Sequence, residues 1–179
     1  MTELDEHGRP ETSGTGDEIS SLQGFLEYQR ATFAWKCGGL DPAGMTATTA
    51  ASTMTLGGMM KHLAYVEDWW FSQVLRDRKP RSPWDAVDWD ADPDWEWRTA
   101  AQDTPEQLDA QWRDSVAHSR AMVAEALAEG GPERPAVKVF EDGRSPSLRW
   151  IMLHMIEEYA RHVGHADLLR ESIDGLTGE

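Results

Sequence analysis

Residues 153–171 read LHMIEEYARHVGHADLLRE. Apolar side chains recur in this stretch every three or four positions, which is typical of one face of an amphipathic helix. At about 100° per residue, four side chains that can bind metal ions fall within a sector of about 80° on the helical wheel. They are His154, Glu158, His162 and His165. This clustering makes the helix the strongest candidate to contribute ligands to a metal site.

The helical wheel separates these four side chains. The apolar arc of the helix includes Ile151, Met155 and Leu169. Glu158 and His162 border that arc, so we expect them to face the interior, one turn apart. His154 and His165 lie on the other side, toward the charged surface, although either could replace one of the expected ligands.

Three more helices are expected upstream of this one. The apolar period indicates helices over residues 18–37, 53–76 and 104–130, and the last helix spans about 145–173. Thr104, Pro105 and Gln107 form the pattern of a capping box at the start of the third helix. By the same reasoning, Ser145 is expected to cap the last helix, with Pro146 in its first turn. Glycines follow the first, third and last helices, and Lys79, Pro80 and Pro83 end the second.

These four helices predict an all-α, four-helix bundle over residues 17–179. The second and third helices are joined by residues 78–103, a connection well above the usual 2–8 residues between bundle helices. Such a length lets the two helices run parallel, joined by a crossover. Residues 1–16 lack an apolar period and are expected to form a disordered or weakly ordered tail.

Charge and composition exclude several classes of function. The 179 residues carry 17 basic and 32 acidic side chains, a net charge of −15, which would repel nucleic acid and anionic membranes. The single cysteine, Cys37, allows no disulfide within the chain and no cysteine-based zinc site. The acidic start of the sequence does not resemble a signal peptide, and a cytoplasmic location is expected.

The second helix offers a third candidate ligand. His62 lies in the middle of a stripe that includes Met59, Val66 and Trp70. Together with Glu158 and His162 it would complete a set of two histidines and one carboxylate. Such a set leaves coordination positions open for water or substrate. Zinc is the expected divalent metal, with nickel, iron and manganese as alternatives.

The residue pattern alone leaves other interpretations open. A single buried histidine is more often a hydrogen-bonded core residue than a ligand. Glu158 and His162 could form a simple solvated contact between helix neighbours. No phosphate-binding loop, serine elbow or dinucleotide fingerprint is present, so no catalytic or cofactor-binding residue is assigned.

Two stretches carry a family resemblance. They are TLGGMMKHLAYVEDWWF, residues 55–71, and RWIMLHMIEEYARHVGHADLLRESIDG, residues 149–175. Both resemble the DinB/YfiT-like superfamily, and most closely an actinobacterial branch of unknown function. The resemblance implies a four-helix bundle with a metal held by one histidine of the second helix and two residues, four apart, of the last. Related proteins include mycothiol-dependent maleylpyruvate isomerase and thiol S-transferases.

The resemblance places the ligands at His62, Glu158 and His162. Many members have histidine at both positions of the last helix. Glu158 departs from that pattern and resembles the isomerase, which leaves the metal's identity open. The implied activity is a metal-dependent enzyme that activates a low-molecular-weight thiol of the mycothiol type, for S-transfer to, or isomerisation of, a small electrophile. Metal-assisted hydrolysis of a small molecule and a non-catalytic, stress-related metal-binding bundle are the alternatives.

The long connection is rich in tryptophan. Trp84, Trp89, Trp95 and Trp97 either pin this segment to the helices or line the mouth of the metal pocket. Arg98 is either a surface residue or a partner for a substrate carboxylate. A homodimer is compatible with the sequence, which does not determine the oligomeric state.

Overall fold

The structure, a computed structural model, describes residues 3–178. In this range the chain is all-α, as expected, and its extended pairings are the isolated bridges Leu4–Pro10 and Pro135–Ser147. The chain divides into two compact units. One combines the described parts of Met1–Leu56 and Met152–Glu179, and the other is Gly57–Ile151. The complete four-helix bundle therefore stays a prediction.

The first unit contains α1 (Glu18–Cys37), α2 (Pro42–Thr46) and most of α6 (Leu148–Asp174). The bounds of α1 confirm the prediction. The structure adds the cap at its start: the Asp17 carboxylate accepts a hydrogen bond from the backbone N–H of Ser20 at 2.7 Å. The short helix α2, capped by Asp41, was not expected from the sequence. A five-residue helix is too short for an apolar period to be recognised.

Contacts between α1 and α6 hold the first unit together. The rings of Phe33 and Tyr159, both fully buried, meet edge to face with centroids 6.3 Å apart. The buried guanidinium of Arg170 donates hydrogen bonds to the carbonyl oxygens of Lys36 at 2.9 Å and Gly38 at 2.7 Å. Arg170 therefore satisfies carbonyl groups that the end of α1 leaves without a helical partner.

Part of the expected tail also packs in the first unit. Arg9 is 5% exposed and donates to Asp5 at 2.6 Å. Its guanidinium lies 4.8 Å from the ring centroid of Tyr28 and 5.2 Å from that of Trp35, which are cation–π distances. Residues 1 and 2 of the expected tail lie outside the described residues.

The second unit begins at Gly57, within α3 (Leu56–Glu67), and this helix continues into a π-helical segment, Asp68–Val74. Together they cover most of the helix expected over residues 53–76. The backbone N–H of Leu75 bonds to the carbonyl of Trp70, five residues back, so this part of the helix is wider than an α-helix. Periodicity cannot distinguish the two types of helix over so short a stretch.

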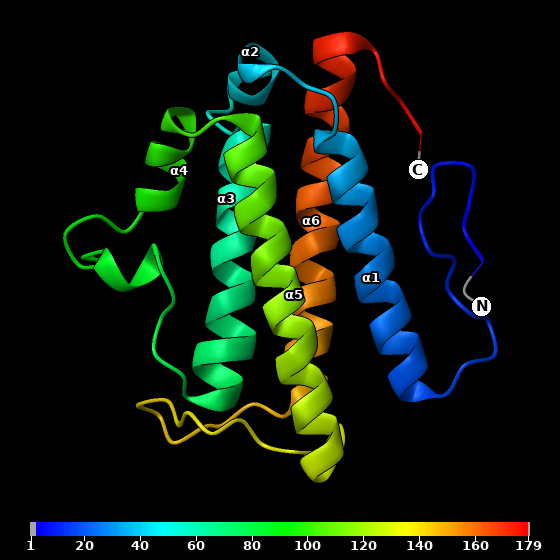
Figure 1. The fold of residues 1–179 in the computed structure, drawn as a ribbon, viewed down its shortest axis with the longest axis vertical. Helices are drawn as coiled ribbons and strands as arrows, with labels where there is room; N and C mark the ends of the chain where they lie inside the picture. The colour runs from blue at the N-terminus through cyan, green and yellow to red at the C-terminus, as the bar shows by residue number, and fades with distance from the viewer. Residues whose placement is uncertain (1–2, 179) are drawn as a thin grey trace. The chain divides into compact units, whose positions relative to one another are not determined.

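The next long helix, α5 (Pro105–Gly130), begins at the predicted capping box. The Gln107 backbone donates to the Thr104 hydroxyl, and the Gln107 side chain accepts from the Thr104 backbone. Two hydrogen bonds link α5 to α3 and the residues that continue it. The Ser119 hydroxyl donates to the carbonyl oxygen of Glu67, and Arg76 donates to Glu129, so residue numbers rise in the same direction along both helices. The two helices therefore run in the same direction, as Figure 1 also shows.

The connection between these helices is more ordered than a plain loop. It contains two short 3-10 helices, Trp84–Ala86 and Ala100–Gln102, and the helix α4 (Trp95–Thr99). Trp84 is 2% exposed, and its ring meets Trp95 edge to face with centroids 6.0 Å apart. Aromatic packing thus supports short helices that the sequence pattern alone did not indicate.

The predicted start of the last helix was wrong by a few residues. The helix α6 begins at Leu148, and the hydroxyl of Ser147 accepts from the Trp150 backbone in the capping position. Ser145 instead donates to the carbonyl oxygen of Ala136 at 2.6 Å. Both serines fit a cap by residue type, and the preceding loop decides which one serves.

Within the described residues, no helix has the length and hydropathy that crossing a membrane requires.

Candidate metal centre

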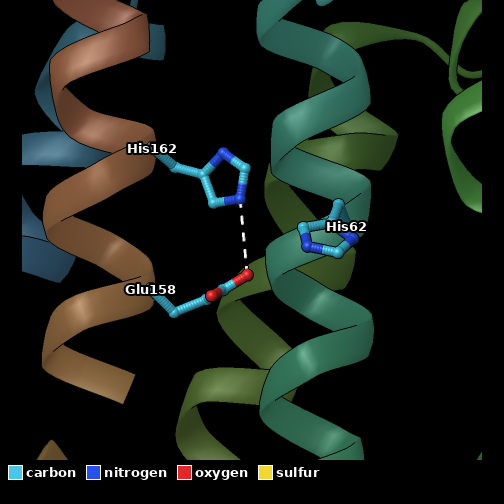
Figure 2. A group of neighbouring side chains, drawn as sticks. All are labelled: His62, Glu158 and His162. Atoms are coloured by element: carbon cyan, nitrogen blue, oxygen red, sulfur yellow. Dashed lines mark ion pairs between the residues drawn. The ribbon is translucent and has the colours of Figure 1, made fainter. Parts of the chain in front are cut away.

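The helix α6 presents Glu158 and His162 beside its buried face. Met155 and Tyr159 on that face are 0% exposed, whereas the Glu158 side chain is 17% exposed and that of His162 is 9% exposed. Both side chains leave consecutive turns of α6 on the same side (Figure 2). Oε1 of Glu158 lies 3.5 Å from Nε2 of His162. Their position at the border of the buried face therefore brings a carboxylate and an imidazole close together and leaves both side chains little exposed.

His62 completes the group that the sequence predicts. One ligand atom each from His62, Glu158 and His162 lies within 4.8 Å of the other two. The donors are two imidazole nitrogens and one carboxylate oxygen, a combination that binds zinc and iron. The chemistry of this donor set fits a divalent cation.

The surroundings of His62 come from the connecting segment. Nδ1 of His62 lies 3.0 Å from Oε1 of Glu96 on α4. Trp97, the next residue, stacks on the imidazole with ring centroids 4.8 Å apart and planes inclined by 27°. The His62 side chain is 18% exposed, so it lies at the edge of the apolar stripe rather than in the core.

The two other histidines of α6 lie differently. Nδ1 of His154 lies 3.5 Å from the exposed carboxylate of Glu157. The ring of His165 meets that of His162 edge to face, with centroids 5.6 Å apart. Burial, followed by the neighbouring His162, lowers the pKa of His165. Among the described residues, neither histidine belongs to the group whose ligand atoms converge.

The four tryptophans of the connection divide into two sets. Trp89 and Trp95 pack with Trp84 and Tyr65, and the rings of Tyr65 and Trp89 stack with centroids 4.2 Å apart. Trp97 stacks on a candidate ligand, His62. The pinning and pocket interpretations therefore apply to different tryptophans.

Arg98 pairs with Asp92 and its side chain is 58% exposed. This hydrogen-bonded ion pair raises the pKa of the guanidinium. The local geometry therefore favours the surface interpretation of Arg98 over the substrate-carboxylate interpretation.

Sequence reasoning missed Glu96. It lies 34 residues from His62 in the chain, within a segment that has no persistent period. Its side chain is only 5% exposed, and Oε2 is buried with no hydrogen-bond partner in the structure as described. The available signal in the sequence was an acidic residue between two tryptophans. Tryptophans on both sides favour a packed segment, and a packed segment can bury a carboxylate.

Comparison with known proteins supplies a family. The family model described as Mycothiol-S-transferase matches residues 21–175. This match confirms the resemblance to DinB/YfiT-like proteins. Among curated proteins, none matches the chain.

Proposed function

Because the chain belongs to the mycothiol S-transferase family, we propose that it is a metal-dependent enzyme that transfers a low-molecular-weight thiol of the mycothiol type to a small electrophile. The observation that carries this proposal is the convergence of His62, Glu158 and His162, whose ligand atoms lie within 4.8 Å of one another. Isomerisation through thiol addition uses the same first step and is included in the proposal.

The three side chains would hold one divalent cation, with zinc as the expected metal. His62 and His162 contribute neutral nitrogen donors, and Glu158 contributes one negative charge. Three protein ligands leave a position open for a small molecule. When bound, the cation supplies a Lewis-acidic position that lowers the pKa of a coordinated thiol and favours the nucleophilic thiolate at neutral pH.

The chain's own residues have further tasks in this mechanism. Trp97 covers one face of the His62 ring and keeps water from that side. Glu96 holds Nδ1 of the same ring. The thiol proton leaves to solvent, the sulfur forms a bond to the electrophilic carbon, and the leaving group departs with the bonding electron pair. In the isomerase variant, the sulfur later leaves again.

The test measures metal and thiol dependence together. Untagged protein is analysed for metals by mass spectrometry, then assayed with 1-chloro-2,4-dinitrobenzene in the presence of mycothiol, of cysteine or of no thiol. We expect one divalent metal per chain and turnover that needs both metal and mycothiol. His162→Ala should lose both properties, whereas the matched control His154→Ala should keep them.

Two results would favour the alternatives. Metal-dependent release of chloride at equal rates with and without thiol would indicate attack by water, the hydrolase interpretation. Protein that takes up no divalent metal, even when metal is supplied, would favour a non-catalytic bundle.

A further inference from the structure

The buried carboxylate of Glu96 has a specific relation to His62. The two side chains belong to α4 and α3, both within the second unit. Oε1 of Glu96 lies 3.0 Å from Nδ1 of His62. Glu96 is 4% exposed, and the connecting segment brings it there from 34 residues away.

The direction of this hydrogen bond follows from the donor inventory. If Glu96 is a carboxylate, it can only accept, and Nδ1 of His62 is then the donor. In a neutral imidazole, the proton on Nδ1 leaves the lone pair on Nε2. Metal-ligating histidines commonly donate the second ring N–H to a carboxylate, which sets both the tautomer and the orientation of the ring.

The stacked ring of Trp97 adds a second constraint. It lies against the face of the imidazole at 4.8 Å, whereas Glu96 holds an edge. Two consecutive residues of α4 therefore restrict both the tilt and the rotation of the His62 ring. The short helix α4 provides both contacts, because the side chains of residues 96 and 97 both reach the same ring.

We propose that Glu96 is a positioning residue that holds His62 as the Nδ1–H tautomer and makes Nε2 its metal-binding atom. This inference rests on the proposed metal site and extends it to a residue outside the ligand set. It also assigns a role to the connecting segment: α4 orients a ligand rather than merely bridging two helices.

The experiment compares Glu96→Gln with the wild type. A glutamine can also donate to Nδ1, which would place the histidine proton on Nε2. Metal affinity is measured by competition with a chelator, and the His62 tautomer by ¹⁵N NMR of the metal-free protein. We expect affinity to fall about 10–100-fold, the range seen when an outer-shell partner is lost. The metal-free wild type should show Nδ1–H, and the variant a larger Nε2–H population.

Two further variants separate positioning from structure. Asp94→Asn removes an exposed carboxylate from the residue before α4 and should leave affinity and tautomer unchanged. Glu96→Asp keeps the charge on a shorter side chain and should recover part of the affinity. If Glu96→Gln fails to fold, as judged by melting temperature, Glu96→Asp and the wild-type tautomer still decide the question.

The outcomes separate this inference from the metal site. Wild-type protein that binds metal, with Glu96→Gln binding within twofold of it, overturns the role of Glu96 and leaves the metal site intact. Wild-type protein that binds no metal overturns the metal site. In that case an Nδ1–H tautomer that depends on Glu96 supports the orienting contact, and an Nε2–H tautomer in the wild type overturns it.

Discussion

Oε1 of Glu158 lies 3.5 Å from Nε2 of His162, one turn further along α6. At this separation a cation can contact both side chains, because they leave the helix on the same side (Figure 2). The pair is little exposed, so it is not a simple surface contact. The predictions that follow concern this pair, its partner His62 and the elements that support them.

Replacing any one of His62, Glu158 and His162 by alanine should release the metal. Three protein ligands leave none to spare, so affinity should fall by more than the roughly 10–100-fold that loss of an outer partner costs. Metal content after dialysis against a weak chelator checks this. His154→Ala and His165→Ala are the controls, and an equal loss from His154→Ala and Glu158→Ala would refute the ligand assignment.

Trp95→Ala and Trp97→Ala should separate support from function. Trp95 packs on the other tryptophans of the connection, so its loss should lower the free energy of unfolding by roughly 2 kcal/mol, below the cost for a fully buried ring. Its turnover per folded molecule should be unchanged. Trp97→Ala should instead raise KM or weaken metal binding, because Trp97 stacks on His62. Identical effects in both variants would contradict the division.

The capping box of α5 should contribute measurably to stability. Thr104→Ala removes the hydroxyl that accepts from the Gln107 backbone, which costs about 1 kcal/mol. For a chain of this size, the melting temperature should fall by about 2–4 °C. Thr104→Ser keeps the acceptor and should melt close to the wild type. A loss in Thr104→Ser as large as in Thr104→Ala would assign the effect to the methyl group.

Asp68 should reduce stability at neutral pH. Asp68 is 1% exposed, and Gln73 donates to its Oδ2 at 2.9 Å. Burial raises the pKa of this carboxyl above its ordinary value of 3.8. The folded state therefore binds the proton more readily than the unfolded state, and stability falls as pH rises between the two pKa values.

Asp68→Asn removes this charge and should melt higher than the wild type at pH 7. The difference should shrink as pH is lowered toward the ordinary aspartate pKa of 3.8, because the buried carboxyl takes up its proton above that value. Thermal melts across that range check the sign, with the exposed Asp90→Asn as the matched control. A gain that grows as pH falls would show that the pKa shift has the opposite sign.

Local signals in the sequence predicted the helices well. Thr104 and Gln107 cap α5 as the sequence predicted, because each of these hydrogen bonds spans only a few residues. The periodicity of α6 likewise placed Glu158 and His162 on one border of its apolar face. Where two local candidates competed, as with Ser145 and Ser147, the sequence did not choose correctly, since the loop that engages Ser145 lies outside the helix pattern.

The sequence by itself determined that the chain is helical, where most of its long helices begin and end, and which residue types could hold a metal. The tertiary structure alone decided what surrounds His62. Glu96 and Trp97 reach that ring because the connection folds back and buries its tryptophans together. Helix signals act over a few residues, whereas a carboxylate 34 residues away is brought to a histidine only by the packing of the segment between them.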